Sequence, residues 1–207
     1  MIAIIDYGMG NLRSVQKAFE RVGHEAHVTR RPEEVARASH VVLPGVGGFP
    51  ECMRNLNRSG MVEALRAAIE QGKPFLGICL GFQLLFTESE EFGLHPGLNI
   101  LKGKVVRFSG KPFDENQEMK IPHMGWNQLR ILKKVPLLDG VEDGSFVYFV
   151  HSFHCVPEDT ALSCAVTDYG APFVSAVQRD NISACQFHPE KSHDVGLRIL
   201  RNFGNLK

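Results

Sequence analysis

The stretch that decides the fold of this 207-residue chain is Lys73-Pro74-Phe75-Leu76-Gly77-Ile78-Cys79-Leu80-Gly81-Phe82-Gln83. Its apolar part, residues 75–78, predicts a buried strand, and a helix is predicted to follow over residues 80–90. Cys79 stands on the turn between them, with one glycine two residues before it and another two residues after it. This spacing is typical of a nucleophile elbow, here with cysteine in place of serine.

The elbow spacing has a steric and an electrostatic reason. Gly77 and Gly81 are required because a Cβ at either position would collide where the strand and the helix approach each other. The start of the helix points amide groups and the positive end of its dipole at the sulfur of Cys79, which favours the nucleophilic thiolate. The amide of Leu80 is then expected to donate to an oxyanion. The alternative, a cysteine packed as a small apolar side chain, is disfavoured by the paired glycines.

Composition excludes several classes of protein. Lysine plus arginine and aspartate plus glutamate both number 23, so no basic excess points to nucleic acid or an anionic membrane as a partner. The N-terminal apolar run stops at Asp6, which is too short for a signal peptide or a membrane span. Five cysteines without a Cys-x-x-Cys pair indicate reduced thiols and a cytoplasmic protein. Without a linker or a repeat, residues 1–207 are predicted to form one domain.

The first ninety residues alternate between strand and helix patterns. Strands are predicted over residues 2–6, 25–29 and 40–44, and helices over residues 12–22, 32–38 and 61–71. This alternation predicts an α/β fold with an open, mostly parallel sheet that carries helices on both faces. Ligands of such folds bind at the carboxyl ends of the strands, where Cys79 is expected to lie.

The pattern changes after residue 95. Short strands without helices between them are predicted over residues 104–108, 126–132, 146–150, 163–166, 173–178 and 182–186. We therefore expect the C-terminal part to be antiparallel or mixed. A last helix is predicted over residues 194–203, with Ser192 as its cap.

The third strand leads into the glycine-rich loop Pro44-Gly45-Val46-Gly47-Gly48. Such a loop leaves the backbone free to aim amides at an anion. In the elbow architecture a second oxyanion donor comes from another strand-end loop, and this loop is predicted to supply it. A simple connecting turn is the alternative.

Two other signals are weaker. Gly8-x-Gly10 follows the first strand, but Arg13 stands where a dinucleotide fingerprint has its third glycine, so a tight turn is favoured. His151 and His154 are close in sequence, but no other clustered ligands support a metal site. The sequence therefore predicts neither a metal nor another cofactor.

A base for the cysteine is predicted at the end of the last strand, in Gln186-Phe187-His188-Pro189-Glu190. The proline restricts the backbone so that His188 and Glu190, two residues apart, can project to the same side. A base needs a carboxylate that holds its tautomer and stabilises the imidazolium. Cys79, His188 and Glu190 then form a triad of nucleophile, base and orienting group.

These motifs resemble the class I, or triad, glutamine amidotransferase family, which has a flavodoxin-like fold. Over nearly the full length, further strings are similar to the members that serve as glutaminase subunits of imidazole glycerol phosphate synthase in histidine biosynthesis. These strings are residues 6–12, 44–47, 122–127, 149–152 and 188–192.

The resemblance implies a reaction. Cys79 would attack the side-chain amide of L-glutamine and form a glutamyl thioester. His188 would protonate the departing ammonia and then activate water, while Glu190 orients it. The backbone of Leu80, together with that of Gly45, Val46 and Gly47, would hold the oxyanion, after a peptide reorients.

The resemblance also implies substrate contacts. Gln83 and Glu91 match positions that hold the amino-acid end of glutamine, and a carboxylate at Glu91 suits an ammonium group. His151, Ser152 and Phe153 match further substrate-binding positions. Phe153 departs from the family pattern, because relatives often carry tyrosine there and its hydroxyl is absent here.

A partner is also implied. The chain carries no second catalytic constellation and no phosphate-cradling loop of the Walker type, and ammonia that is released into water becomes protonated and loses its nucleophilicity. The family supplies the receiver, a (β/α)8-barrel cyclase subunit that forms a heterodimer with the glutaminase. The positions that match the shared face are Asn11, Pro122, Met124, Trp126, Tyr148 and Lys191.

Two alternatives remain open. The same glutaminase could serve another synthase, which the sequence separates poorly. A non-enzymatic protein of this fold could sense oxidants through Cys79, although His188 and Glu190 argue against it.

Overall fold

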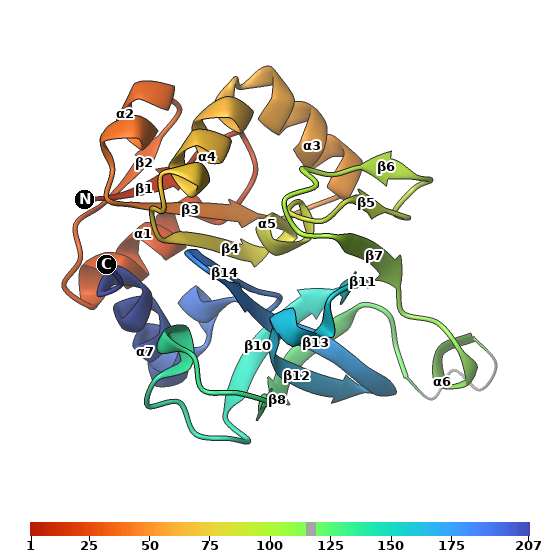
Figure 1. Ribbon diagram of the computed structural model, residues 1–207. Coiled ribbons are helices and arrows are strands. Elements are labelled where there is room, and N and C mark those ends of the chain that lie inside the picture. The colour runs from red at the N-terminus through yellow and green to blue at the C-terminus, as the bar shows by residue number, and fades with distance from the viewer. Residues whose placement is uncertain (115–118) are drawn as a thin grey trace.

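The computed structural model describes residues 1–114 and 119–207, and a twisted eight-stranded sheet lies at its centre (Figure 1). The four pairs from β2 to β14 are parallel, whereas β13, β12 and β9 add to that edge in antiparallel fashion. The strand order is β2 (Ala26–Thr29), β1 (Ile2–Ile5), β3 (His40–Gly45), β4 (Phe75–Cys79), β14 (Ile182–Cys185), β13 (Ala171–Arg179), β12 (Ser163–Tyr169), β9 (Arg130–Ile131).

Alternation along β1 divides the apolar core into two layers. Ile2 and Ile4 join the cluster that contains side chains of α1 (Leu12–Arg21) and α7 (His193–Gly204). Ala3 and Ile5 join the opposite cluster, to which α2 (Pro32–Arg37), α3 (Phe49–Arg58) and α4 (Met61–Glu70) contribute. Successive side chains of a strand point to opposite faces, so a fully apolar strand must be covered twice. The predicted open sheet with helices on both faces is confirmed (Figure 1).

Two smaller sheets are built from strands that lie between residues 88 and 157. One pairs β8 (His123–Gln128) with β10 (Phe146–His151), antiparallel. The other runs in the order β11 (Phe153–Pro157), β7 (Gly103–Arg107), β5 (Glu88–Ser89), β6 (His95–Pro96), with only β5 and β7 parallel. The antiparallel C-terminal part is confirmed, while α3, β5, β6 and β11 were not predicted. Single-turn helices complete the fold: α6 (Lys111–Asp114), η1 (Pro136–Leu138), η2 (Thr160–Leu162) and η3 (Pro189–Lys191).

The large sheet takes strands from both ends of the chain, and the single domain over residues 1–207 stays a prediction. In the part of the chain that the structure describes, no helix combines the length and the apolar character that a membrane span requires.

The elbow between β4 and α5 (Leu80–Gln83) forces Cys79 into an unusual backbone conformation, with φ 55° and ψ −111°. A Cβ at Gly81 would lie 1.8 Å from the carbonyl oxygen of Leu43, and one at Gly77 would lie 3.1 Å from the Cα of Phe82. The two glycines are therefore required for the reason that the sequence suggested: the turn packs backbone to backbone.

The helix predicted over residues 80–90 is wrong, because α5 ends at Gln83. Leu84, Leu85 and Phe86 are buried as expected, but their carbonyl groups accept from a loop instead of a helix. The amide of Leu98 donates to Leu84 O at 2.8 Å, for example. Only one helical turn follows Cys79, so the helix end that was predicted to face the sulfur belongs to a single turn, with a smaller dipole than a longer helix has.

The elbow contact predicts a steep difference between two glycine substitutions. Gly81→Ala is expected to lower the free energy of unfolding by more than about 3 kcal/mol, since the new Cβ would overlap the backbone of β3. Gly72→Ala is the control: it meets no atom within 4 Å, and its φ of +77° costs about 1–2 kcal/mol. Urea unfolding of both variants measures the difference, and equal losses would contradict it.

Candidate active site

A cavity of about 290 Å³ opens at the carboxyl ends of β3 and β4. Its walls contain Cys79, His188 and every residue predicted to bind the substrate. The lining residues are Val46, Gly47, Cys79, Leu80, Gln83, Glu91, Pro122, Val150, His151, Ser152, Phe153 and His188. Val150 was not predicted, and Pro122 was predicted on another surface. Gly45 does not line the cavity, and Glu190 lies behind His188.

The pairing of β14 with β4 brings the two ends of the site together. Cys185 lies opposite Ile78 in this parallel pair, so the chain that leaves β14 passes beside the elbow. The amide of His188 donates to Tyr148 O at 2.9 Å, which ties the same segment to β10. His188 has an extended backbone just before the turn η3 and Glu190 lies within that turn, and their side chains meet.

His188 and Glu190 form a buried pair. Nδ1 of His188 lies 2.8 Å from Oε1 of Glu190, and the two side chains are only 2% and 1% exposed. Burial lowers the pKa of His188, but the adjacent Cys79 thiolate and the Glu190 carboxylate outweigh it and raise that pKa to about 10. The Nε2 atom is buried and has no hydrogen-bond partner among the described residues, and His188 lines the same cavity as Cys79. Glu190 therefore orients the imidazole through Nδ1, while Nε2 remains available for proton transfer.

Ser192 stabilises this arrangement in a way that corrects the sequence prediction. It does stand at the start of α7, but its side chain makes no capping bond to that helix. Its hydroxyl instead donates to His188 O at 2.7 Å and accepts from the amide of Tyr148 at 3.0 Å. A capping serine accepts from an amide of its helix, whereas this serine accepts from the amide of Tyr148 and so holds the turn that carries the pair.

Gln186 was missed by the sequence reading. Its side chain is fully buried beside the elbow, and its Nε2 lies 3.8 Å from the sulfur of Cys79. Its Oε1 accepts from Nε2 of Gln83 at 3.0 Å, and that same nitrogen donates to Phe153 O at 3.0 Å. The signal that could have found it is its position at the end of the strand beside β4. The amide of Gln83 is thus engaged with the walls of the cavity.

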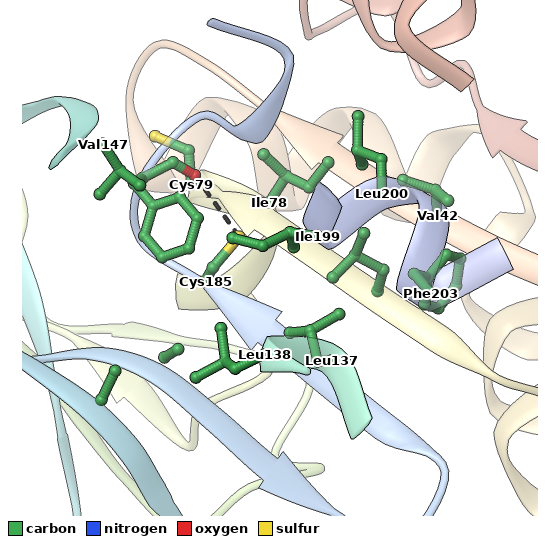
Figure 2. Packing of buried hydrophobic residues seen from close by; sticks show 14 of the residues in the cluster. Val42, Ile78, Cys79, Leu137, Leu138, Val147, Cys185, Ile199, Leu200 and Phe203 are labelled. Carbon is green, nitrogen blue, oxygen red and sulfur yellow. Dashed lines mark hydrogen bonds between the residues drawn. The ribbon is translucent and has the colours of Figure 1, made fainter. Parts of the chain in front are cut away.

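An apolar layer lies beneath the elbow. Cys79, Ile78 and Val147 pack together with Cys185, whose thiol donates to Phe187 O at 3.5 Å (Figure 2). Burial raises the pKa of the Cys185 thiol well above its ordinary value, so this neighbouring sulfur stays neutral. Of the two, only the sulfur of Cys79 faces the cavity.

Glu91 lies at the rim of the cavity. Its Oε2 accepts from the amide of Phe49, the first residue of α3, at 2.8 Å. Burial raises the pKa of this carboxyl, and the hydrogen bond from Phe49 partly opposes that rise. The amide therefore holds one oxygen and leaves the other available to a ligand in the cavity.

Val46 and Gly47 are exposed on the cavity wall, whereas Gly45 is buried at the end of β3. A Cβ at Gly45 would lie 2.7 Å from the hydroxyl of Tyr7 and 2.8 Å from the amide of Gly81. Gly47 has φ of +95°, a conformation that favours glycine. The loop predicted to hold an oxyanion thus passes directly above the elbow.

Two buried histidines form a chain of hydrogen bonds behind the cavity. Nδ1 of His151 donates to Phe153 O at 2.8 Å, so its Nε2 accepts, and Nδ1 of His123 donates to it at 3.0 Å. Nε2 of His123 is then left to accept from the amide of Asn127 at 3.3 Å. Burial lowers the pKa of His151 to about 3 and that of His123 to about 4, so both rings are neutral. They hold the backbone that lines the cavity at Phe153.

The ring of His154 belongs to an aromatic cluster with Phe108, and His151 is committed to the chain of hydrogen bonds. Within residues 1–114 and 119–207, no group of three or more histidine, cysteine, aspartate or glutamate side chains is arranged to hold a metal ion. Gly8 and Gly10 both have positive φ, as the predicted tight turn requires.

Three of the six residues predicted to meet a partner, Met124, Trp126 and Tyr148, lie on the ribbon of β8 and β10. Met124 is 61% exposed and Trp126 is 44% exposed, and Trp126 lies opposite Tyr148. Lys191 places its Nζ 5.8 Å from the ring of Tyr148. His193, which was not predicted, stacks on Trp126 at 4.9 Å. Asn11 is half-buried just before α1, and Pro122 is exposed at the cavity.

The neutral histidine chain predicts a loss of stability in acid. Unfolded histidine takes up a proton near pH 6.5, but His123 and His151 do so only at about 4 and 3. Lowering the pH from 7 to 5 therefore protonates them only in the unfolded state and costs about 1–2 kcal/mol for each.

His123→Asn is expected to reduce that pH-dependent loss by about 1 kcal/mol, since one of the two groups is gone. Urea unfolding at pH 7 and pH 5 measures it. The control is His27→Gln, because the His27 side chain is 56% exposed. A variant with the wild-type pH dependence would show that His123 does not contribute.

Comparison with known proteins agrees with this geometry. The family model described as glutamine amidotransferase class-I matches residues 3–205. Imidazole glycerol phosphate synthase subunit HisH of Syntrophotalea carbinolica is 59% identical, and the match covers 100% of both chains. The subunit of the same name from Geobacter sulfurreducens is 56% identical over 100% of this chain and 99% of its own.

Solved structures share the fold at lower identity. A crystal structure of a glutamine amidotransferase has a TM-score of 0.74 and 20% identity, with both chains fully covered. PurLQS from Thermotoga maritima has a TM-score of 0.72 and 18% identity over 98% of this chain and 96% of its own. Since the family model and the full-length relatives agree, the chain belongs to the class-I glutamine amidotransferase family, among the HisH subunits of imidazole glycerol phosphate synthase.

Proposed function

We propose that this chain hydrolyses L-glutamine to glutamate and ammonia with Cys79, His188 and Glu190, and that it passes the ammonia to a cyclase subunit. The observation that carries the proposal is the buried His188–Glu190 pair, whose free Nε2 belongs to a ring in the same cavity as the elbow cysteine. Such a pair is costly to bury and is useful where a base must be held in one tautomer.

The first half of the reaction forms a thioester. The protonated His188 keeps Cys79 as a thiolate, which attacks the carbon of the substrate amide. Charge on the resulting oxygen is stabilised by the amide of Leu80 and by the loop that contains Gly45, Val46 and Gly47. His188 then gives its proton to the leaving nitrogen, the carbon–nitrogen bond breaks, and ammonia departs.

The second half regenerates the thiolate. A water molecule loses a proton to the neutral His188 and attacks the thioester carbon. The carbon–sulfur bond breaks and glutamate leaves, so that the thiolate and the imidazolium are restored. Glu190 stabilises the imidazolium at both stages through its 2.8 Å contact with Nδ1.

Substrate orientation follows from the shape of the cavity. The free oxygen of Glu91 accepts a hydrogen bond from the ammonium group of glutamine, and Gln83 helps to position the amino-acid end of the substrate. His151, Ser152 and Phe153 form the opposite wall, where their backbone is held by the histidine chain. With phenylalanine at position 153, this wall offers no hydroxyl to the substrate.

The receiver of ammonia is proposed to be a (β/α)8-barrel cyclase that makes imidazole glycerol phosphate in histidine biosynthesis and forms a heterodimer with this chain. The exposed Met124 and Trp126 on the β8–β10 ribbon support this, because tryptophan is favoured at interface centres. Asn11, Pro122, Tyr148 and Lys191 complete the proposed face. The five free cysteines support a reducing, cytoplasmic location.

Replacement of the nucleophile and of the orienting group gives the decisive test. Cys79→Ala is expected to abolish glutamate release by the complex with the cyclase. Glu190→Gln is expected to lower kcat by about 10²-fold or more, since an amide no longer stabilises the imidazolium. Glu158→Gln, at an exposed position, is the control. Glutamate release that survives in Cys79→Ala would refute the mechanism.

Activity is also expected to depend on the partner. The chain alone should hydrolyse glutamine slowly, and the cyclase with its ligand bound should speed the reaction greatly, because the glycines of the loop allow the oxyanion site to be incomplete at rest. Steady-state glutamate release, measured with and without the partner, tests this. Equal rates would argue against a loop that completes the site only in the complex.

A further inference from the structure

Two polar side chains are buried beneath the oxyanion loop and have no part in the mechanism above. The hydroxyl of Tyr7 donates to the carbonyl oxygen of Pro44 at 2.9 Å. The thiol of Cys52 donates to the carbonyl oxygen of Val46 at 3.4 Å. Tyr7 is 5% exposed and Cys52 is fully buried, so both bonds lie within the core.

The two donors come from different rigid elements. Tyr7 follows β1, which is paired on both sides in the large sheet. Cys52 lies in the first turn of α3, where its amide donates to Gly48 O at 3.1 Å. Each bond therefore ties one carbonyl of the loop to a residue outside it, one after β1 and one in α3.

The bonded carbonyls are two residues apart and enclose a single peptide unit, the one that joins Gly45 to Val46. Gly45 itself has no room for a side chain, because a Cβ there would overlap the hydroxyl of Tyr7 and the amide of Gly81. Rotation of this unit changes ψ of Gly45 and φ of Val46, and the first of these changes meets no Cβ because residue 45 is glycine. Rotation of this unit changes whether its amide or its carbonyl faces Cys79.

Both donors remain protonated at any physiological pH. Burial raises the pKa of Cys52 to about 12, although Tyr7 partly opposes that rise. Burial also raises the pKa of Tyr7 well above its ordinary value, and the neighbouring Cys52 adds to that rise. Neutral O–H and S–H groups can only serve a carbonyl as donors, so these contacts persist across the working range.

We propose, on the basis of the function proposed above, that Tyr7 and Cys52 act as positioning residues: they hold the carbonyls of Pro44 and Val46 and confine reorientation of the oxyanion loop to the Gly45–Val46 peptide. Without these two hydrogen bonds the oxyanion loop would populate several conformations, and binding of the partner would have to order the whole loop. We call this pair of hydrogen bonds the clamp. It therefore increases the fraction of molecules whose glutaminase activity the partner stimulates.

The kinetic test compares Tyr7→Phe, Cys52→Ala and Cys52→Ser in complex with the cyclase. Tyr7→Phe and Cys52→Ala are expected to lower the ratio of stimulated to unstimulated kcat by about 5-fold or more, with the KM for glutamine changed less than about 2-fold. Cys52→Ser should restore most of the ratio, because its hydroxyl can still donate to Val46. Cys164→Ala, another fully buried cysteine on β12, is the matched control and should keep the wild-type ratio.

A spectroscopic measurement on the chain alone separates this inference from the proposed function. With carbonyl-¹³C valine, the Val46 resonance should move upfield in Cys52→Ala and not in Cys164→Ala, because a hydrogen bond to the carbonyl is lost. Wild-type chain that never releases glutamate would overturn the proposed function only. An unmoved Val46 resonance, or wild-type kcat ratios in Tyr7→Phe and Cys52→Ala, would overturn the clamp.

Discussion

The structure depends on a steric constraint: the turn after Cys79 lies against the end of β3 with no space for a side chain between them. Three glycines meet there, and the backbone of Gly81 passes so close to Leu43 that even a methyl group would overlap it. This contact sets the height of the sulfur above the sheet. It also brings the loop after β3 directly above that sulfur, so one constraint places both the nucleophile and the loop that faces it.

The electrostatic part of the site is built on this frame. A histidine and a carboxylate are buried as a pair, which is expensive unless each satisfies the other. The turn that carries them is fixed by hydrogen bonds from Ser192 and to Tyr148, which link it to α7 and β10. The buried pair is thus held by a helix and by a strand of the smaller ribbon, which pack in the same core layer.

The sequence allowed much of this to be predicted where the signals were local. The alternation of strands and helices, the glycine spacing around Cys79 and the two-residue spacing of His188 and Glu190 are short-range patterns. The failures share a long-range cause. The helix after the elbow stops at Gln83, and the carbonyls of the next three residues, 84–86, accept from amides of residues 98–101 instead of continuing it.

Other features depend on partners that are distant in sequence. The first amide of α3 is satisfied by the carboxylate of Glu91, 42 positions away. His123 and His151 meet across 28 positions, and Gln186 reaches Gln83 across 103. No periodicity or motif encodes such meetings, because they exist only once the sheet has brought the strand ends together. The fold is confirmed, whereas the chemical roles of the individual site residues remain predictions.

The β8–β10 ribbon is a single layer, and this has a mechanical consequence. His123 and Met124 are neighbours on β8, yet the first is buried in the histidine chain and the second is exposed on the outer surface. A partner that binds the outer face of the ribbon contacts the same strand whose inner face carries the histidine chain behind the substrate wall. A displacement of the outer face of β8 therefore also displaces the inner face that carries the histidine chain, because both faces belong to one strand.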